Sequence, residues 1–154
     1  MAPAPLLVRP FADADAPAVI SLIERVLGEF GFAPDMGGVR RDVASDAYRG
    51  ANAGLWVAEI DGAVAGTVGV RPKEGRTCEL KRLYVRGDLR GHGLGRSLYL
   101  HAEAFARSAG YERIWLESSR RFVAARRLYE ASGFVLLEEL HNDWEDNLYE
   151  KRLG

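Results

Sequence analysis

The sequence has little cysteine, no long hydrophobic run and no excess of basic charge. Its one cysteine, Cys78, excludes an internal disulfide, suits a reducing compartment and is expected to be a small core residue of a strand. No segment approaches the roughly 18 consecutive apolar residues of a transmembrane helix. The 21 Lys and Arg residues are balanced by 22 Asp and Glu residues, unlike the basic excess of nucleic-acid-binding proteins. We therefore expect neither a membrane nor a nucleic acid as partner.

Length and composition are typical of one soluble domain. The 154 residues are 47% hydrophobic and 28% charged, enough to bury a core without disulfides. The N-terminus lacks a charged start followed by an apolar stretch, so we expect no signal peptide. No group of His, Cys and Asp residues has metal-ligand spacing, so we expect no metal. The prediction is a single cytoplasmic domain over residues 1–154, with a homodimer left open.

Hydrophobic patterns predict a mixed α/β domain. A strand at 6–9 precedes a helix in which Asp13 or Asp15 would be the N-cap and Pro17 would lie in the first turn. Residues 28–54 have poor periodicity and predict at most one short helix around 39–48. The remaining predicted elements are a hairpin of strands 55–60 and 63–70 joined by Asp61-Gly62, a strand at 77–85, a helix from about 94 to 109, a strand at 112–116, a helix from about 121 to 131, and strands at 134–140 and 148–152.

The most informative segment is residues 80–97, where an extended stretch passes through a glycine-rich, basic loop into a helix. Glycines allow the backbone to come close to a ligand. A helix beginning at about Leu94 would direct unpaired N–H groups and the positive end of its dipole to the same place. This arrangement predicts a site for an anion such as a pyrophosphate. The residues concerned are Gly91, Gly93 and Gly95, flanked by Arg90 and Arg96.

Two familiar phosphate-binding loops match this segment less well. A Walker loop requires Lys followed by Ser or Thr after its last glycine, where this chain has Arg96 and Ser97. The dinucleotide fingerprint requires a glycine at the position of Arg96 and an acidic residue about 20 positions further on. Glu117 meets only the second requirement, so a nicotinamide cofactor is disfavoured.

Two motifs together resemble the GCN5-related N-acetyltransferases. The family signature Arg/Gln-x-x-Gly-x-Gly/Ala matches residues 90–95, and Ala-x-x-Leu-Tyr-x-x-x-Gly-Phe matches residues 125–134. The resemblance covers about residues 52–152 well and the first 50 residues only in outline. It implies acetyl-CoA as cosubstrate. It also implies a GNAT-like mixed, mostly antiparallel sheet of about seven strands, with its fourth and fifth strands splayed apart and about four helices flanking it.

The resemblance also suggests which residues contact the cofactor. Main-chain groups of Leu83 and Val85 would meet the thioester and the pantetheine arm. Many relatives have Asn seven residues before the motif tyrosine, where this chain has Phe122, so other contacts such as Ser118 must replace it. The residues expected to bind the cofactor are Leu83, Tyr84, Val85, Arg90, Gly91, His92, Gly93, Leu94, Gly95, Arg96, Ser97 and Ser118.

Acetyl transfer from a thioester to an amine requires a base, a stabiliser of the carbonyl oxygen and an acid. Tyr129 is expected to be the acid, since a tyrosine pKa of about 10 is near that of a thiol; the alternative is a core tyrosine with a hydrogen-bonded tip. Glu79 stands at the family's spacing for a catalytic base, or it pairs with a nearby Arg or Lys. Glu117 is a second candidate for the base or for amine binding.

The sequence defines the acceptor least. Residues 138–150 contain six acidic residues, no Lys or Arg, and Trp144, which either attract a cationic amine or form a solvated loop. We expect acetyl transfer to a primary amine of a small-molecule or amino-acid-like acceptor by direct attack. The alternatives are a peptide or protein acceptor, and a non-catalytic CoA-binding regulatory domain.

Overall fold

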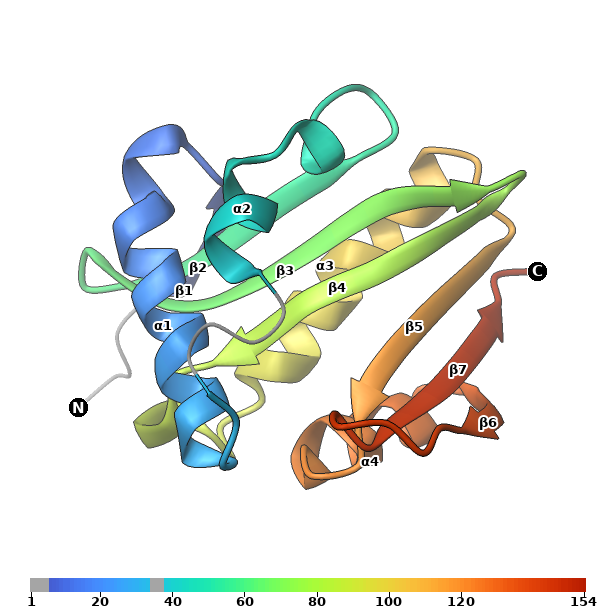
Figure 1. Ribbon diagram of the computed structural model, residues 1–154. Helices are drawn as coiled ribbons and strands as arrows, with labels where there is room; N and C mark the ends of the chain where they lie inside the picture. Colours follow the sequence, from blue (N-terminus) through green and yellow to red (C-terminus); the bar gives the residue numbers. More distant parts are fainter. Residues whose placement is uncertain (1–5, 34–37) are drawn as a thin grey trace.

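The computed structural model describes residues 6–33 and 38–154, so the first five residues, on which part of the signal-peptide prediction rests, lie outside it. Seven strands form one sheet in the order β1-β2-β3-β4-β5-β7-β6 (Figure 1). The strands are β1 (Leu6–Pro10), β2 (Gly54–Ile60), β3 (Ala63–Glu74), β4 (Thr77–Val85), β5 (Arg113–Ser119), β6 (Val135–Glu139) and β7 (Asp146–Arg152).

The helices cover both faces of the sheet. They are α1 (Ala16–Glu29), α2 (Val39–Ala44), α3 (Leu94–Ser108) and α4 (Val123–Ala131). α1 and α2 lie on one face and α3 on the other, which divides the core into two clusters (Figure 1). Cys78 is fully buried in the α3 cluster, as predicted, and burial raises the pKa of its thiol to about 12. Within the described ranges no helix is long and apolar enough to cross a membrane.

The two central strands diverge, as the family resemblance implies. β4 and β5 pair in parallel from Thr77 opposite Arg113 to Glu79 opposite Trp115, whereas the other neighbouring strands pair antiparallel. Beyond Glu79 the two strands continue without pairing to each other, so a wedge opens between them (Figure 1).

β4 contains a bulge beside this wedge. Its register against β3 shifts between the pairs Gly69–Lys81 and Thr67–Tyr84, so β4 has one extra residue there. Arg82, in the bulge, has a φ of 58°, which is uncommon for a residue with a side chain. The bulge therefore interrupts the regular strand where β4 begins to line the wedge.

Most predicted elements are present, and their ends differ by a few residues. The hairpin turn is confirmed, since Asp61 and Gly62 both have positive φ, which a two-residue type I′ turn requires. The predicted helix at 39–48 is α2 followed by a short 3₁₀ turn at Asp46–Tyr48. β5 extends three residues beyond its predicted end, and β7 begins two residues before its predicted start.

Of the two predicted N-caps of α1, Asp15 occupies the N-cap position, whereas Asp13 lies in a preceding 3₁₀ turn. The Asp15 side chain makes no hydrogen bond that caps α1. The Asp15 carboxylate instead accepts hydrogen bonds from Arg9, at 2.8 Å, and from the Ala12 N–H. The charged partner on β1 competes successfully for this carboxylate. Pro17 lies in the first turn, as predicted.

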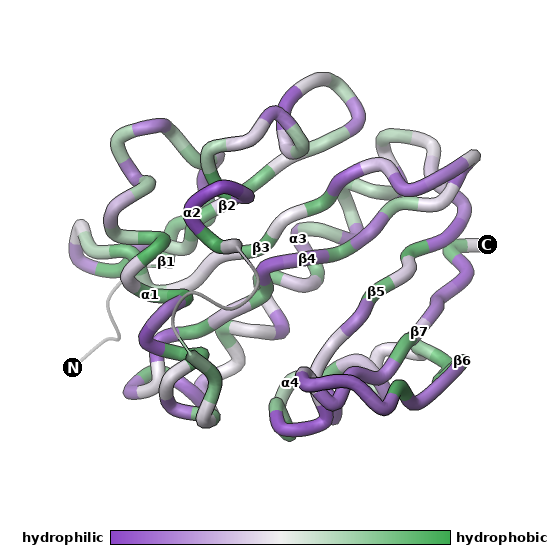
Figure 2. Tube along the Cα trace, viewed as in Figure 1, coloured by the Kyte–Doolittle hydropathy of each residue, from purple (hydrophilic) through white to green (hydrophobic). Residues whose placement is uncertain are grey.

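Hydropathy changes along β3 and β4. β3 is hydrophobic up to Val70, where α1 and α3 cover it, and hydrophilic from Arg71 to Glu74 (Figure 2). The segment around the start of β7 is also hydrophilic (Figure 2). Hydrophilic residues therefore gather on β3 and β7, the strands that lie next to the two strands flanking the wedge.

Candidate active site

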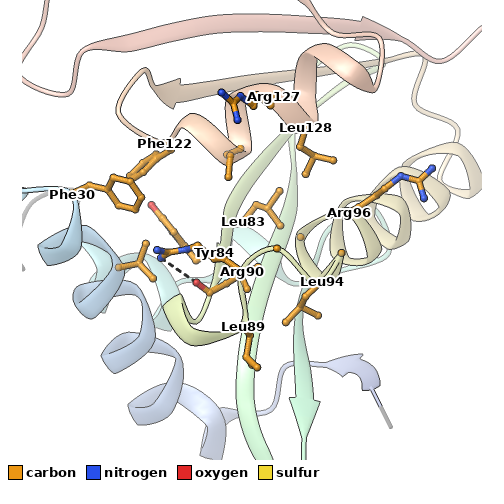
Figure 3. A pocket seen from close by; sticks show the side chains of 17 residues that line it. Phe30, Leu83, Tyr84, Leu89, Arg90, Leu94, Arg96, Phe122, Arg127 and Leu128 are labelled. Atoms are coloured by element: carbon orange, nitrogen blue, oxygen red, sulfur yellow. Dashed lines mark hydrogen bonds between the residues drawn. The ribbon is translucent and has the colours of Figure 1, made fainter. Parts of the chain in front are cut away.

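A cavity of about 370 Å³ opens between β4, the glycine loop, α3 and α4 (Figure 3). Its walls are mainly apolar, and the C-terminal end of α1 contributes Val26 and Phe30. We call it the first cavity. The predicted cofactor residues that line it are Leu83, Tyr84, Val85, Arg90, Gly91, Gly93, Leu94, Gly95 and Arg96.

Three predicted cofactor residues do not line the first cavity. His92 and Ser97 are exposed, and the Ser97 hydroxyl donates a hydrogen bond to the Gly93 carbonyl at 3.1 Å. Ser118 lines a different cavity, on the other side of the β4 bulge. The geometry therefore does not bring these three side chains to the predicted cofactor site.

The glycine loop presents its backbone N–H groups. Gly91 and Gly93 have φ values of 84° and 80°, which side-chain-bearing residues rarely adopt. The N–H groups of residues 91–96 donate to no residue that the structure describes, and the first bond of this turn runs from Ser97 N to Gly93 O at 3.0 Å. These amides and the N-terminus of α3 have the arrangement that the predicted anion site requires.

The arginines beside the loop differ in their partners. Arg90 lies 2.6 Å from the Glu29 carboxylate and donates to the Val85 carbonyl at 3.3 Å (Figure 3). Its charge is therefore balanced, and it holds the loop. Arg96 and Arg127 line the cavity without an ion pair to the rest of the described chain. Arg127 is not among the predicted contacts, although its place in the second motif is a usable signal.

Phe122, which stands where many relatives have Asn, forms an apolar wall. Its ring centroid lies 5.0 Å from that of Phe30, edge to face, and 6.1 Å from that of Tyr84. Phe30 follows α1 and belongs to residues 28–54, whose poor hydrophobic periodicity predicts little secondary structure. One wall of the first cavity is thus built from packed aromatic rings (Figure 3).

A second cavity, of about 170 Å³, lies in the wedge between β4 and β5. Leu83, Tyr84, Phe122 and Ala125 line both cavities, so the two meet beside the β4 bulge. The polar residues of this second cavity are Lys81, Arg82, Glu117, Ser118, Ser119, Tyr129 and Asp146.

Tyr129 reaches the second cavity from the aromatic core. It is 4% exposed and packs against Phe134 and Tyr149, with centroid distances of 5.6 and 6.2 Å. Its hydroxyl has no hydrogen-bond partner within the described ranges. Burial, followed by the nearby Tyr84 and Tyr149, raises its pKa. The hydroxyl thus remains protonated and is available to a ligand, unlike the hydrogen-bonded tip of a purely structural tyrosine.

The two candidate bases have different surroundings. Glu79 accepts a hydrogen bond from Arg71 Nε at 2.8 Å and does not line the second cavity, so it has the ion-pair geometry of the structural alternative. Glu117 lines the cavity and has no ion pair within the described ranges. Loss of hydration, followed by the charges of Asp146 and Glu79, raises the pKa of Glu117.

The acidic segment contributes one carboxylate to the second cavity. Asp146 is 8% exposed and accepts a hydrogen bond from Asn142 Nδ2 at 3.2 Å, while burial raises its pKa. Trp144 also lines the cavity and stacks on Phe32 at 4.7 Å. The other five acidic residues lie outside the cavity, as in a solvated segment; they are Glu138, Glu139, Asp143, Glu145 and Glu150.

Arg82, in the β4 bulge, forms an ion pair with Asp42 of α2. Its Nε lies 2.7 Å from Asp42 Oδ2, to which the Tyr48 hydroxyl also donates at 2.6 Å. Burial opposes ionisation of Asp42, but the hydrogen bonds from Tyr48 and Arg82 outweigh it and lower its pKa. This buried ion pair links α2 to the bulge where the two cavities meet.

A family model for the acetyltransferase (GNAT) family matches residues 22–134. The chain belongs to the GNAT family. YjgM, an uncharacterised N-acetyltransferase of Escherichia coli K12, is 33% identical over 141 residues, 87% of this chain and 84% of YjgM. N-acetylaspartate synthetase of Rattus norvegicus is 39% identical over 81 residues, 52% of this chain, but the match spans 27% of that protein.

A solved structure supports the GNAT fold. YncA from Salmonella typhimurium, solved with its cofactor acetyl-CoA, has a TM-score of 0.78 and 21% identity, covering 97% of this chain and 94% of that one. The seven-stranded, mostly antiparallel sheet is therefore the GNAT sheet, as predicted. From its family and its relatives, the protein is an N-acetyltransferase, an enzyme of the acyltransferase class.

Proposed function

We propose that this GNAT enzyme transfers the acetyl group of acetyl-CoA to the primary amine of a small, amino-acid-like acceptor by direct attack. The observation that carries the proposal is the meeting of two cavities at the β4 bulge. One has unpaired amides and arginines, and the other has carboxylates and an unpaired tyrosine hydroxyl. The second cavity, at about 170 Å³, suits a small acceptor better than a peptide segment.

The first cavity fits the parts of a CoA molecule. The N–H groups of residues 91–96 would bind the pyrophosphate, and Arg96 and Arg127 would add positive charge. The apolar wall, which includes Leu83 and Phe122, suits the less polar pantetheine arm. The thioester would then lie near the bulge, where both cavities are accessible.

Residues of the second cavity would carry the proton transfers. Glu117 would take the proton from the acceptor ammonium, so that the neutral nitrogen attacks the carbonyl carbon and forms the C–N bond. The Leu83 N–H, beside the bulge, would stabilise negative charge on the carbonyl oxygen. Tyr129 would protonate the sulfur as the C–S bond breaks, and the second proton that the nitrogen loses would restore the Tyr129 hydroxyl. The products are an N-acetyl amide and the free thiol of CoA.

Glu79 would support the site without accepting the proton. Its ion pair with Arg71 holds it at the edge of the wedge, and Arg71 also lies 3.4 Å from Asp42. The base that family spacing assigns to Glu79 is thus placed at Glu117, on the facing strand.

Calorimetric titration with acetyl-CoA, with NADH and ATP as controls, tests the first cavity. Binding of acetyl-CoA alone, followed by amine-dependent release of free thiol, is the expected result. Binding of all three ligands, or of none, would contradict the assignment of the loop.

The pH dependence of kcat/KM distinguishes the two carboxylates. A base must be deprotonated, so the rate rises with pH through the pKa of Glu117, which lies above the ordinary glutamate value. Glu117→Gln should abolish this rise of kcat/KM with pH, whereas Glu79→Gln should retain it. If only Glu79→Gln abolished the rise, Glu79 and not Glu117 would be the base.

A further inference from the structure

The charges in and next to the second cavity fall into two groups. Arg82 is paired with Asp42 at 2.7 Å, and Glu79, behind it on β4, is paired with Arg71 at 2.8 Å. These four side chains neutralise one another across β3, β4 and α2, so none of them needs a ligand for charge balance.

Three other charges are left without an ion pair among the described residues. Lys81 comes from β4, Glu117 from β5 and Asp146 from the start of β7, and all three line the second cavity. In the β5–β7 register, Glu117 is opposite Leu148 and Asp146 is opposite Ser119, so the two carboxylates lie close together on one side of the wedge. Lys81 stands on the other side. The cavity therefore presents a cation facing a pair of carboxylates.

We infer that Lys81 binds a carboxylate of the acceptor, while Asp146 and Glu117 receive its ammonium group, so that the acceptors are α-amino acids. This inference rests on the proposed acetyl transfer and names its substrate class. Lys81 is half-buried and makes no ion pair within the described ranges, so a ligand carboxylate could supply it with a charge-assisted hydrogen bond.

Simple amines and polyamines fit this charge pattern less well. Either would satisfy the carboxylates, but neither would neutralise Lys81, and a second ammonium group would be repelled by it. Burial, followed by the positive charges of Arg71 and Arg82, already lowers the pKa of Lys81. A negative ligand group restores its charged form.

The position of Lys81 also limits the distance between the carboxylate and the amine. Lys81 precedes the bulge, and Leu83 lies within it, at the junction with the first cavity. Two residues of a fully extended strand span roughly 7 Å, and the bulge interrupts the extended conformation, so the Cα atoms of Lys81 and Leu83 are at most that far apart. A carboxylate bound at Lys81 thus lies close to the place where the amine must meet the thioester, which favours a carboxylate on the carbon next to the amine.

Matched acceptor pairs test the inference. Each α-amino acid is compared with the amine left by its decarboxylation, for example phenylalanine with phenethylamine, with acetyl-CoA as donor and free thiol as readout. The native enzyme should prefer the best amino acid by at least about tenfold in kcat/KM. Lys81→Met should lower the ratio of kcat/KM for that amino acid to kcat/KM for the matched simple amine by about 10- to 100-fold. Lys81→Arg should retain part of the preference.

Lys73→Met is the matched control. Lys73 lies on the neighbouring strand, 3.7 Å above the Trp115 ring and outside the second cavity, so its replacement should leave the preference unchanged. Equal turnover of amino acids and simple amines, or an equal loss of both in Lys81→Met, would overturn the inference and leave acetyl transfer intact.

A binding measurement separates the inference from the proposed function. If no amine yields free thiol although acetyl-CoA binds, the proposed transfer fails. Amino acids are then titrated into the protein saturated with CoA. Binding that is lost in Lys81→Met would support the carboxylate site by itself, and its absence in the native protein would overturn it.

Discussion

The two cavities differ in the origin of their functional groups. The first is built largely from one continuous stretch, residues 83–96, and from backbone N–H groups. The second collects side chains from β4, β5, α4 and the start of β7. A continuous motif can specify a backbone conformation, and such a site can persist while the acceptor changes. Recognition of the acceptor depends on which side chains the fold brings to the wedge.

The largest effect should come from the ion pair that links α2 to the bulge. Asp42→Asn leaves Arg82 buried without its carboxylate and should lower the free energy of unfolding by about 3 kcal/mol in urea at pH 7. Because the folded pKa of Asp42 is lowered, the stabilisation is present above its unfolded pKa and is lost as pH falls through the folded value. The variant should lack this acid dependence.

Asp46→Asn is the control for this ion pair. Asp46 is almost fully exposed and lies 3.5 Å from Arg49, so its replacement should change the stability by less than about 0.5 kcal/mol. Equal stability of the two variants would mean that Asp42 does not hold the bulge.

The second effect lies in the second cavity. Tyr129→Phe keeps the aromatic packing and removes the hydroxyl, so kcat should fall about 100-fold while the Kd of acetyl-CoA stays within about twofold. Steady-state kinetics measures kcat, and calorimetric titration measures the Kd of acetyl-CoA. Tyr111→Phe, which loses only a hydroxyl bonded to the Asn52 carbonyl, should behave like the native enzyme. Unchanged kcat would remove Tyr129 from the mechanism.

The third effect is confined to the first cavity. A Cβ on Gly95 would approach Val85 and Leu128 at 3.7 and 3.9 Å, ordinary contact distances, so Gly95→Ala should fold normally. Its methyl group would occupy the cavity wall and raise the Kd of acetyl-CoA about tenfold, by roughly the energy of one lost hydrogen bond. Gly28→Ala, on the exposed side of α1, should leave the Kd unchanged.

The smallest effect concerns charge at the rim of the first cavity. Arg127→Gln should raise the Kd of acetyl-CoA by up to about fivefold and weaken its dependence on salt, since exposed charge pairs contribute about 1 kcal/mol or less. The neighbouring Arg126 pairs with Glu130 at 3.1 Å outside the cavity. Arg126→Gln should therefore leave the Kd of acetyl-CoA unchanged. Equal increases of the Kd in both variants would mean that Arg127 acts only through the overall surface charge and not by contact with the cofactor.

The glycine loop of the first cavity can be predicted from sequence motifs because its backbone conformation depends on residues that are neighbours in the chain. The positive φ values of Gly91 and Gly93 and the start of α3 at Leu94 follow from residues that are neighbours in the chain. The same reasoning misses Phe30, which reaches this cavity from the end of α1. It also counts Arg90 as a free charge, because the partner Glu29 lies 61 positions earlier.

Periodicity and motifs within short stretches predict the succession of strands and helices along the chain, the glycine loop and the family. Which acids line the second cavity could be learned only from the folded arrangement of the strands. Glu79 is paired with Arg71, whereas Asp146 and Glu117 lie at the wedge beside Lys81. The physical reason is that the hydration and charge balance of an ionisable group depend on neighbours that are far away in the chain.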